Sequence, residues 1–67
     1  MNTYIKLVKR VYSPTPDGDV YSTIKQINFF RYTSQCAFEE KMFGYVELRR
    51  YRDPMNYSII VVVVEEA

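Results

Sequence analysis

The chain offers few side chains that could catalyse a reaction. Its 67 residues contain one cysteine, Cys36, and no histidine. The commonest general base near neutral pH is therefore missing, and the thiol has no imidazole to activate it. Cys36 falls in the first turn of a predicted helix, a place that can favour reactivity, but cysteine is also among the most frequently buried residues. We therefore expect a structural cysteine and a protein that is not an enzyme.

The acidic residues form no recognisable catalytic or metal-binding group. Glu39 and Glu40 are neighbours in a predicted helix, so their side chains diverge by about 100°. The segment 17–19 (DGD) matches part of a calcium loop but lacks the later acidic ligands and the closing glutamate. Asp and Gly are also ordinary turn residues. With no glycine-rich phosphate loop and no Cys/His metal spacing, the sequence predicts no metal and no cofactor.

Two segments, 29–32 (FFRY) and 48–52 (LRRYR), place arginine beside aromatic rings. Proteins bind single-stranded nucleic acid with rings that stack on bases and cations that follow phosphates. On an extended strand Arg49 and Tyr51 share one face, but Glu47 falls in the same row and the net charge is only +1. Single-stranded nucleic-acid binding is therefore an alternative function. Its candidate residues are Arg31, Arg49, Tyr51 and Arg52.

The hydrophobic pattern predicts the order strand–strand–helix–strand–strand. We expect strands over 4–12, 20–30, 45–52 and 57–65, and a helix over 35–43 that is capped by Thr33 or Ser34 and ends before Gly44. This order predicts a single α+β domain, residues 1–67, with one short helix packed on one face of a four-stranded antiparallel sheet. A small bent β-barrel is the alternative fold.

The first predicted hairpin turns through 13–18, a segment rich in proline, aspartate and glycine. Pairing Tyr12 with Asp19 across this loop gives one apolar face. The pattern changes parity at Ile27 and Phe29, so a bulge or a bend there is expected to return both side chains to the core.

The second predicted hairpin turns through 53–56, and pairing Arg52 with Tyr57 places Val46 and Leu48 on the core face opposite valines of the last strand. The reverse face then carries the remaining aromatic, charged and branched residues of these two strands. That set is Tyr45, Glu47, Arg49, Tyr51, Ile60, Val62 and Val64.

The run 59–64 (IIVVVV) is apolar on both faces if it is extended. A chain of this size hides only about 60% of its unfolded surface, so we expect something else to cover the second face. The first functional hypothesis is therefore a protein-binding module that forms a homodimer and acts by occupying the surface of a partner protein. Its candidate residues are Tyr45, Arg49, Tyr51, Ile60, Val62 and Val64.

In its small size, near-neutral charge, aromatic richness and lack of catalytic motifs, the chain resembles the short α+β accessory proteins of phages and mobile elements. That resemblance implies an inhibitor of host machinery. Residues 1–6 lack the pattern of a signal peptide, and no apolar run is long enough to span a bilayer as a helix. We expect a complete cytoplasmic protein that does not bind membranes.

Overall fold

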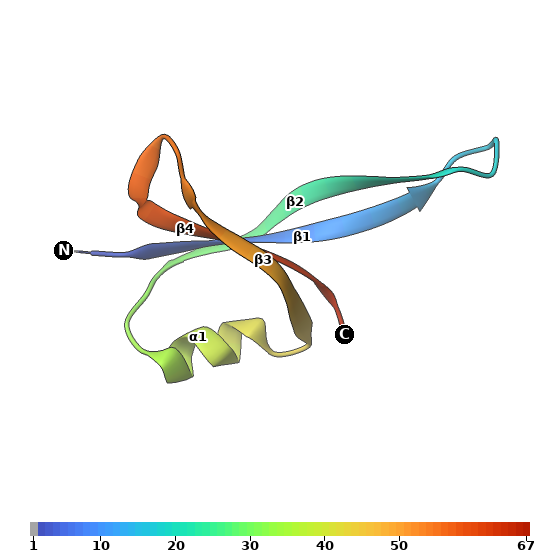
Figure 1. Ribbon diagram of the computed structural model, residues 1–67. Coiled ribbons are helices and arrows are strands. Elements are labelled where there is room, and N and C mark those ends of the chain that lie inside the picture. Colours follow the sequence, from blue (N-terminus) through green and yellow to red (C-terminus); the bar gives the residue numbers. More distant parts are fainter. Residues whose placement is uncertain (1) are drawn as a thin grey trace.

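The computed structural model describes residues 2–67, which form one four-stranded sheet and one helix (Figure 1). The predicted order of elements is confirmed. The strands lie in the order β2-β1-β4-β3 in an open sheet, so the alternative of a closed barrel is wrong. The elements are β1 (Tyr4–Pro14), β2 (Val20–Arg31), α1 (Gln35–Met42), β3 (Tyr45–Asp53) and β4 (Asn56–Glu66).

The sheet is mixed, which corrects the prediction of an antiparallel sheet. Each hairpin is antiparallel, but the central strands β1 and β4 are parallel to each other. The reason is that α1 is a crossover connection, which returns the chain to the end where β2 began. The second hairpin therefore turns at the opposite end of the sheet from the first, and the inner strands of the two hairpins, β1 and β4, run in the same direction.

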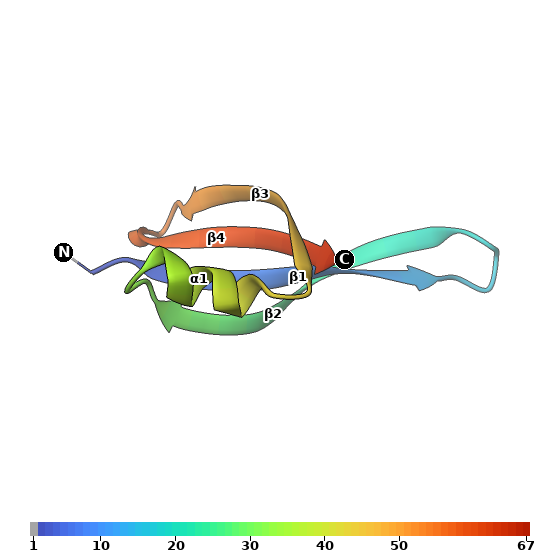
Figure 2. The ribbon, with the colours of Figure 1, turned by 90° about the horizontal axis from the view of Figure 1, so that it is seen from below.

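The first hairpin is longer than predicted, because Pro14 pairs with Val20 and Tyr12 pairs with Ser22. Only residues 15–19 form the loop, which is closed by the backbone N–H of Thr15 donating to the carbonyl oxygen of Asp19 at 2.7 Å. β1 pairs with β4 only as far as Lys9, and the part of the hairpin after that point, residues 10–24, continues as a two-stranded arm, here called the ribbon (Figure 2).

The predicted bulge in β2 is present. Leu7 pairs with Asn28 and Val8 with Gln26, so Ile27 is the unpaired extra residue, and it packs against the main core. Phe29, which was predicted to return to the core with Ile27, does not. It lies opposite Lys6 on the other face and is 48% exposed.

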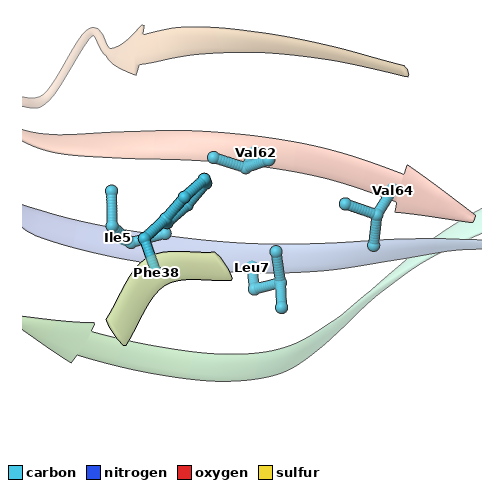
Figure 3. Packing of buried hydrophobic residues seen from close by; sticks show 5 residues of the cluster. All are labelled: Ile5, Leu7, Phe38, Val62 and Val64. Carbon is cyan, nitrogen blue, oxygen red and sulfur yellow. The ribbon is translucent and has the colours of Figure 1, made fainter. Parts of the chain in front are cut away.

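The main core lies between α1 and the centre of the sheet. Phe38, the buried residue of α1, packs against Ile5 and Leu7 of β1 and against two valines of β4 (Figure 3). The helix begins at the predicted Ser34 cap, whose Oγ accepts a hydrogen bond from the backbone N–H of Ala37.

Ile60, Val62 and Val64 belong to this core, and the interpretation that they lie on an open face is wrong. Val62 and Val64 are 0% exposed, and Ile60 packs against the same cluster. The reason is the position of β1 beside β4, which lets the N-terminal strand and α1 enclose the alternate side chains of β4. A partner is therefore not needed to cover them.

The second hairpin also differs from its predicted register. Arg52 pairs with Ile60 rather than with Tyr57, and a bulge leaves Leu48 unpaired. Val46 and Leu48, predicted as core, are 48% and 39% exposed. The bulge reverses the faces of the residues that follow it, so the two halves of β3 alternate out of phase.

Candidate functional site

One face of the sheet has no helix over it; we call it the helix-free face (Figures 1 and 2). At its centre Val8, Val61 and Val63 form a small buried cluster that is separate from the core under α1. Opposed residues of paired strands point to the same face, so the register identifies the other side chains around this cluster. Within residues 2–67, no helix stands between this face and a ligand.

The helix-free face is basic. The register places four cationic side chains on it, namely Lys6 and Arg10 of β1, Arg31 of β2 and Arg49 of β3. Two carboxylates of the described strands lie on or beside this face, those of Glu65, opposite Val46, and of Asp53, two residues after Tyr51 at the end of β3. The helix-free face therefore carries a net positive charge, although the whole chain is nearly neutral.

The bulge at Leu48 removes a further carboxylate from this face. It places Glu47 on the helix side of β3, opposite the buried Val64, whereas Arg49 lies opposite Val63 on the helix-free face. On the helix side, Arg50 donates from Nε to Glu47 Oε2 at 2.8 Å and from Nη2 to Glu47 Oε1. These bonds hold the pKa of the Glu47 carboxyl below its usual range. The expectation that Glu47 shares a row with Arg49 and Tyr51 is wrong.

Exposed aromatic rings accompany the cations. Tyr4 and Phe29 stack on adjacent strands with centroids 5.7 Å apart and planes 8° from parallel. On β3 the guanidinium carbon of Arg49 lies 4.9 Å from the centroid of Tyr51, which is 41% exposed. Two ring systems therefore flank the central valines: Arg49 lies over Tyr51, and Lys6 pairs with Phe29 across β1 and β2.

The structure brings together Arg31, Arg49 and Tyr51, three of the four residues proposed for nucleic-acid binding. Arg52 is not with them: it pairs with Ile60 on the helix side and its Nη1 donates to the carbonyl oxygen of Tyr57 at 2.6 Å. Of the residues predicted to bind protein, Tyr45 packs against the main core.

Sequence reasoning missed the contribution of β1 to this face, and from β2 it included Arg31 but not Phe29. The residues concerned are Tyr4, Lys6, Arg10 and Phe29. Their signal was present in the alternation of the N-terminal strand, whose even-numbered positions carry aromatic or basic side chains around Val8. The β2 bulge, which fixes the face of Phe29, was needed to complete the set.

The chain matches no protein-family model, no curated protein and no solved structure. Residues 2–67 contain no helix of the length and apolar character that crossing a membrane requires. Within the same residues, no three of the side chains that commonly ligate metals are grouped for an ion. The cytoplasmic location stays a prediction.

Proposed function

We propose that this chain is a non-enzymatic module that binds single-stranded nucleic acid on its helix-free face. The observation that supports this most is the charge of that face, where four cationic side chains outnumber the carboxylates around exposed rings. Phosphates need the cations, and unpaired bases need rings whose faces are accessible. The sheet provides both on a surface that no other layer covers.

The arrangement suits binding that tolerates many base sequences. Phe29 and Tyr51 offer ring faces on the two outer strands, and each stacked base contributes about 1–3 kcal/mol. Lys6, Arg31 and Arg49 lie between or beside these rings, where they can contact the connecting phosphates. We therefore expect affinity to depend on strandedness and salt more than on base identity.

Fluorescence anisotropy tests this proposal. A labelled single strand of about 12 nucleotides, DNA or RNA, is titrated at roughly 50 and 200 mM salt, with a duplex of the same sequence as control. Four phosphate contacts to a single strand predict a log–log salt slope of about −2.8, so affinity should fall about 50-fold between these concentrations. The absence of binding to either single strand at low salt would refute the proposal, as would a preference for the duplex.

Protein binding is a second candidate, and the ribbon favours it. On the helix-free side of the ribbon, Tyr12, Val20 and Ile24 are 54%, 65% and 55% exposed. A two-stranded hairpin is marginally stable in water, and an apolar row on it commonly marks a contact surface. The proposed homodimer, and inhibition of a partner protein, would use this row in place of the buried valines of β4.

Replacing Ile24 with aspartate tests the second candidate. If the ribbon mediates self-association, the wild type is a dimer and the Ile24→Asp variant a monomer, because the charge would be buried in the interface. Size-exclusion chromatography with light scattering measures both masses. Lys25→Asp, on the adjacent position and the opposite side of the ribbon, is the control and should remain dimeric. If the wild type is monomeric at about 0.2 mM, a dimer with a dissociation constant below that concentration is excluded.

A further inference from the structure

A cavity of about 270 Å³ lies on the helix side of the sheet, away from the helix-free face. Its apolar lining comes from Ile5 of β1, Phe38 of α1 and Ile60 of β4. Ile5 and Phe38 are buried, and Figure 3 shows the Phe38 ring extending over the sheet close to Ile5. Small-molecule sites commonly have volumes of about 300–1,000 Å³, so this cavity suits a compact ligand.

The polar side chains at the mouth of the cavity offer hydrogen-bond donors. The Tyr32 hydroxyl donates to Gln35 Oε1 at 2.9 Å, which leaves the Gln35 amide nitrogen as a donor for a ligand. Arg50 uses Nε and Nη2 to hold Glu47, and within residues 2–67 its Nη1 makes no hydrogen bond. Two acceptors beside the cavity, Gln35 Oε1 and the Glu47 carboxylate, are thus already bonded. Two donors, Arg50 Nη1 and the Gln35 amide nitrogen, have no partner within residues 2–67.

Arg50 lies at the boundary between the apolar lining and solvent. Its guanidinium carbon is 5.5 Å from the centroid of the Phe38 ring, and the ring belongs to the lining. The bidentate bond to Glu47 fixes the guanidinium plane, so little side-chain freedom remains to be lost when a ligand binds. A planar anion next to an apolar body matches this arrangement, because arginine binds carboxylates through directed, charge-assisted bonds.

We propose that this cavity binds a carboxylate carried on a compact apolar body. The apolar part lies against Ile5, Phe38 and Ile60, and the carboxylate accepts hydrogen bonds from Arg50 Nη1 and the Gln35 amide. A free short-chain acid and the C-terminal residue of an apolar peptide share this chemistry. The site is independent of nucleic-acid binding, since Arg49 and Arg50 point to opposite faces of β3.

Backbone amide NMR of the full chain tests the proposal, with hexanoate and N-acetyl-leucine as probes for the two sources. The amide signals of residues 35–38 and 60 should shift with saturation, and a ligand of this size predicts a dissociation constant of about 1 mM. Hexanol and hexylamine have similar apolar bodies without the carboxylate. We expect each to bind at least about tenfold more weakly than hexanoate, because the charge-assisted bond is missing.

Arg50→Gln should weaken hexanoate binding about tenfold, and Arg49→Gln, one residue away on the opposite face, should leave it unchanged. The comparison of ligands on the wild type decides the question even if Arg50→Gln is unstable. Binding of hexanol as tight as that of hexanoate would overturn the proposal, and so would shifts that do not saturate or that centre on Val61 and Val63. If the cavity binds no carboxylate, the proposed nucleic-acid binding is still tested independently by the oligonucleotide titration.

Discussion

Replacing Val62 with aspartate is expected to abolish the folded state. Val62 is 0% exposed in the core with Leu7 and Phe38, so a carboxylate there would lose its hydration, and the cation opposite it, Arg50, is already paired with Glu47. Burying an unpaired charge costs more than the roughly 3–5 kcal/mol of net stability that a domain of this size usually has. The amide NMR spectrum should lose its dispersion, and the near-ultraviolet circular dichroism of the tyrosines should disappear.

Val20→Asp is the matched control for this prediction. It makes the same substitution in the same sheet, but Val20 is 65% exposed on the ribbon, so at a concentration where the protein is monomeric the free energy of unfolding should change by no more than about 0.5 kcal/mol. A folded Val62→Asp variant with native dispersion would show that β4 is not enclosed by β1 and α1. It would also restore the original interpretation, in which Val62 belongs to a contact surface.

Local residue preferences were enough to predict the elements of this fold. Branched residues in β4, the Ser34 cap, the turn residues within 15–19 and Gly44, which follows α1 with a φ of +88°, each act over a few neighbouring residues. The bulge at Ile27 was predictable for the same reason, because the parity of apolar residues changes there. Local signals of this kind are independent of how the hairpins are placed beside each other.

The pairing of β1 with β4 could not be predicted in this way. An apolar run such as 59–64 is compatible with an edge strand covered by a partner and with a central strand covered by its own chain. The choice depends on the crossover through α1, which places β4 beside β1 and parallel to it. Once β4 is central, its two apolar faces fill two separate clusters, and the apparent excess of apolar surface disappears.

The candidate site depended on a bulge that the sequence did not reveal. The segment 45–52 alternates in a way that fits an unbroken strand, so Glu47, Arg49 and Tyr51 were assigned to one face. The extra residue Leu48 separates the acid from the other two. A shift of one residue in a strand exchanges its faces, and it converts a mixed surface into a basic one.

Removing two cations from the helix-free face should greatly weaken nucleic-acid binding. In the Arg31→Ala/Arg49→Ala variant, two of the four proposed phosphate contacts are lost. The salt slope for a single strand should fall from about −2.8 to about −1.4, so the loss of affinity between 50 and 200 mM salt becomes roughly sevenfold. Removing Arg49 also takes away the cation over Tyr51, which adds to the loss at low salt.

The Lys25→Ala/Lys41→Ala variant removes the same number of charges from the helix side of the molecule. Lys25 pairs with Lys9 on that side, and Lys41 lies in α1 with its Nζ 5.7 Å from the centroid of the Phe30 ring. If binding reflects only net charge, both double variants lose affinity equally. If the helix-free face binds the strand, the lysine variant keeps the wild-type salt slope and the arginine variant does not. Equal slopes would show that the ligand follows the overall charge and that the face carrying Arg31 and Arg49 is not its site.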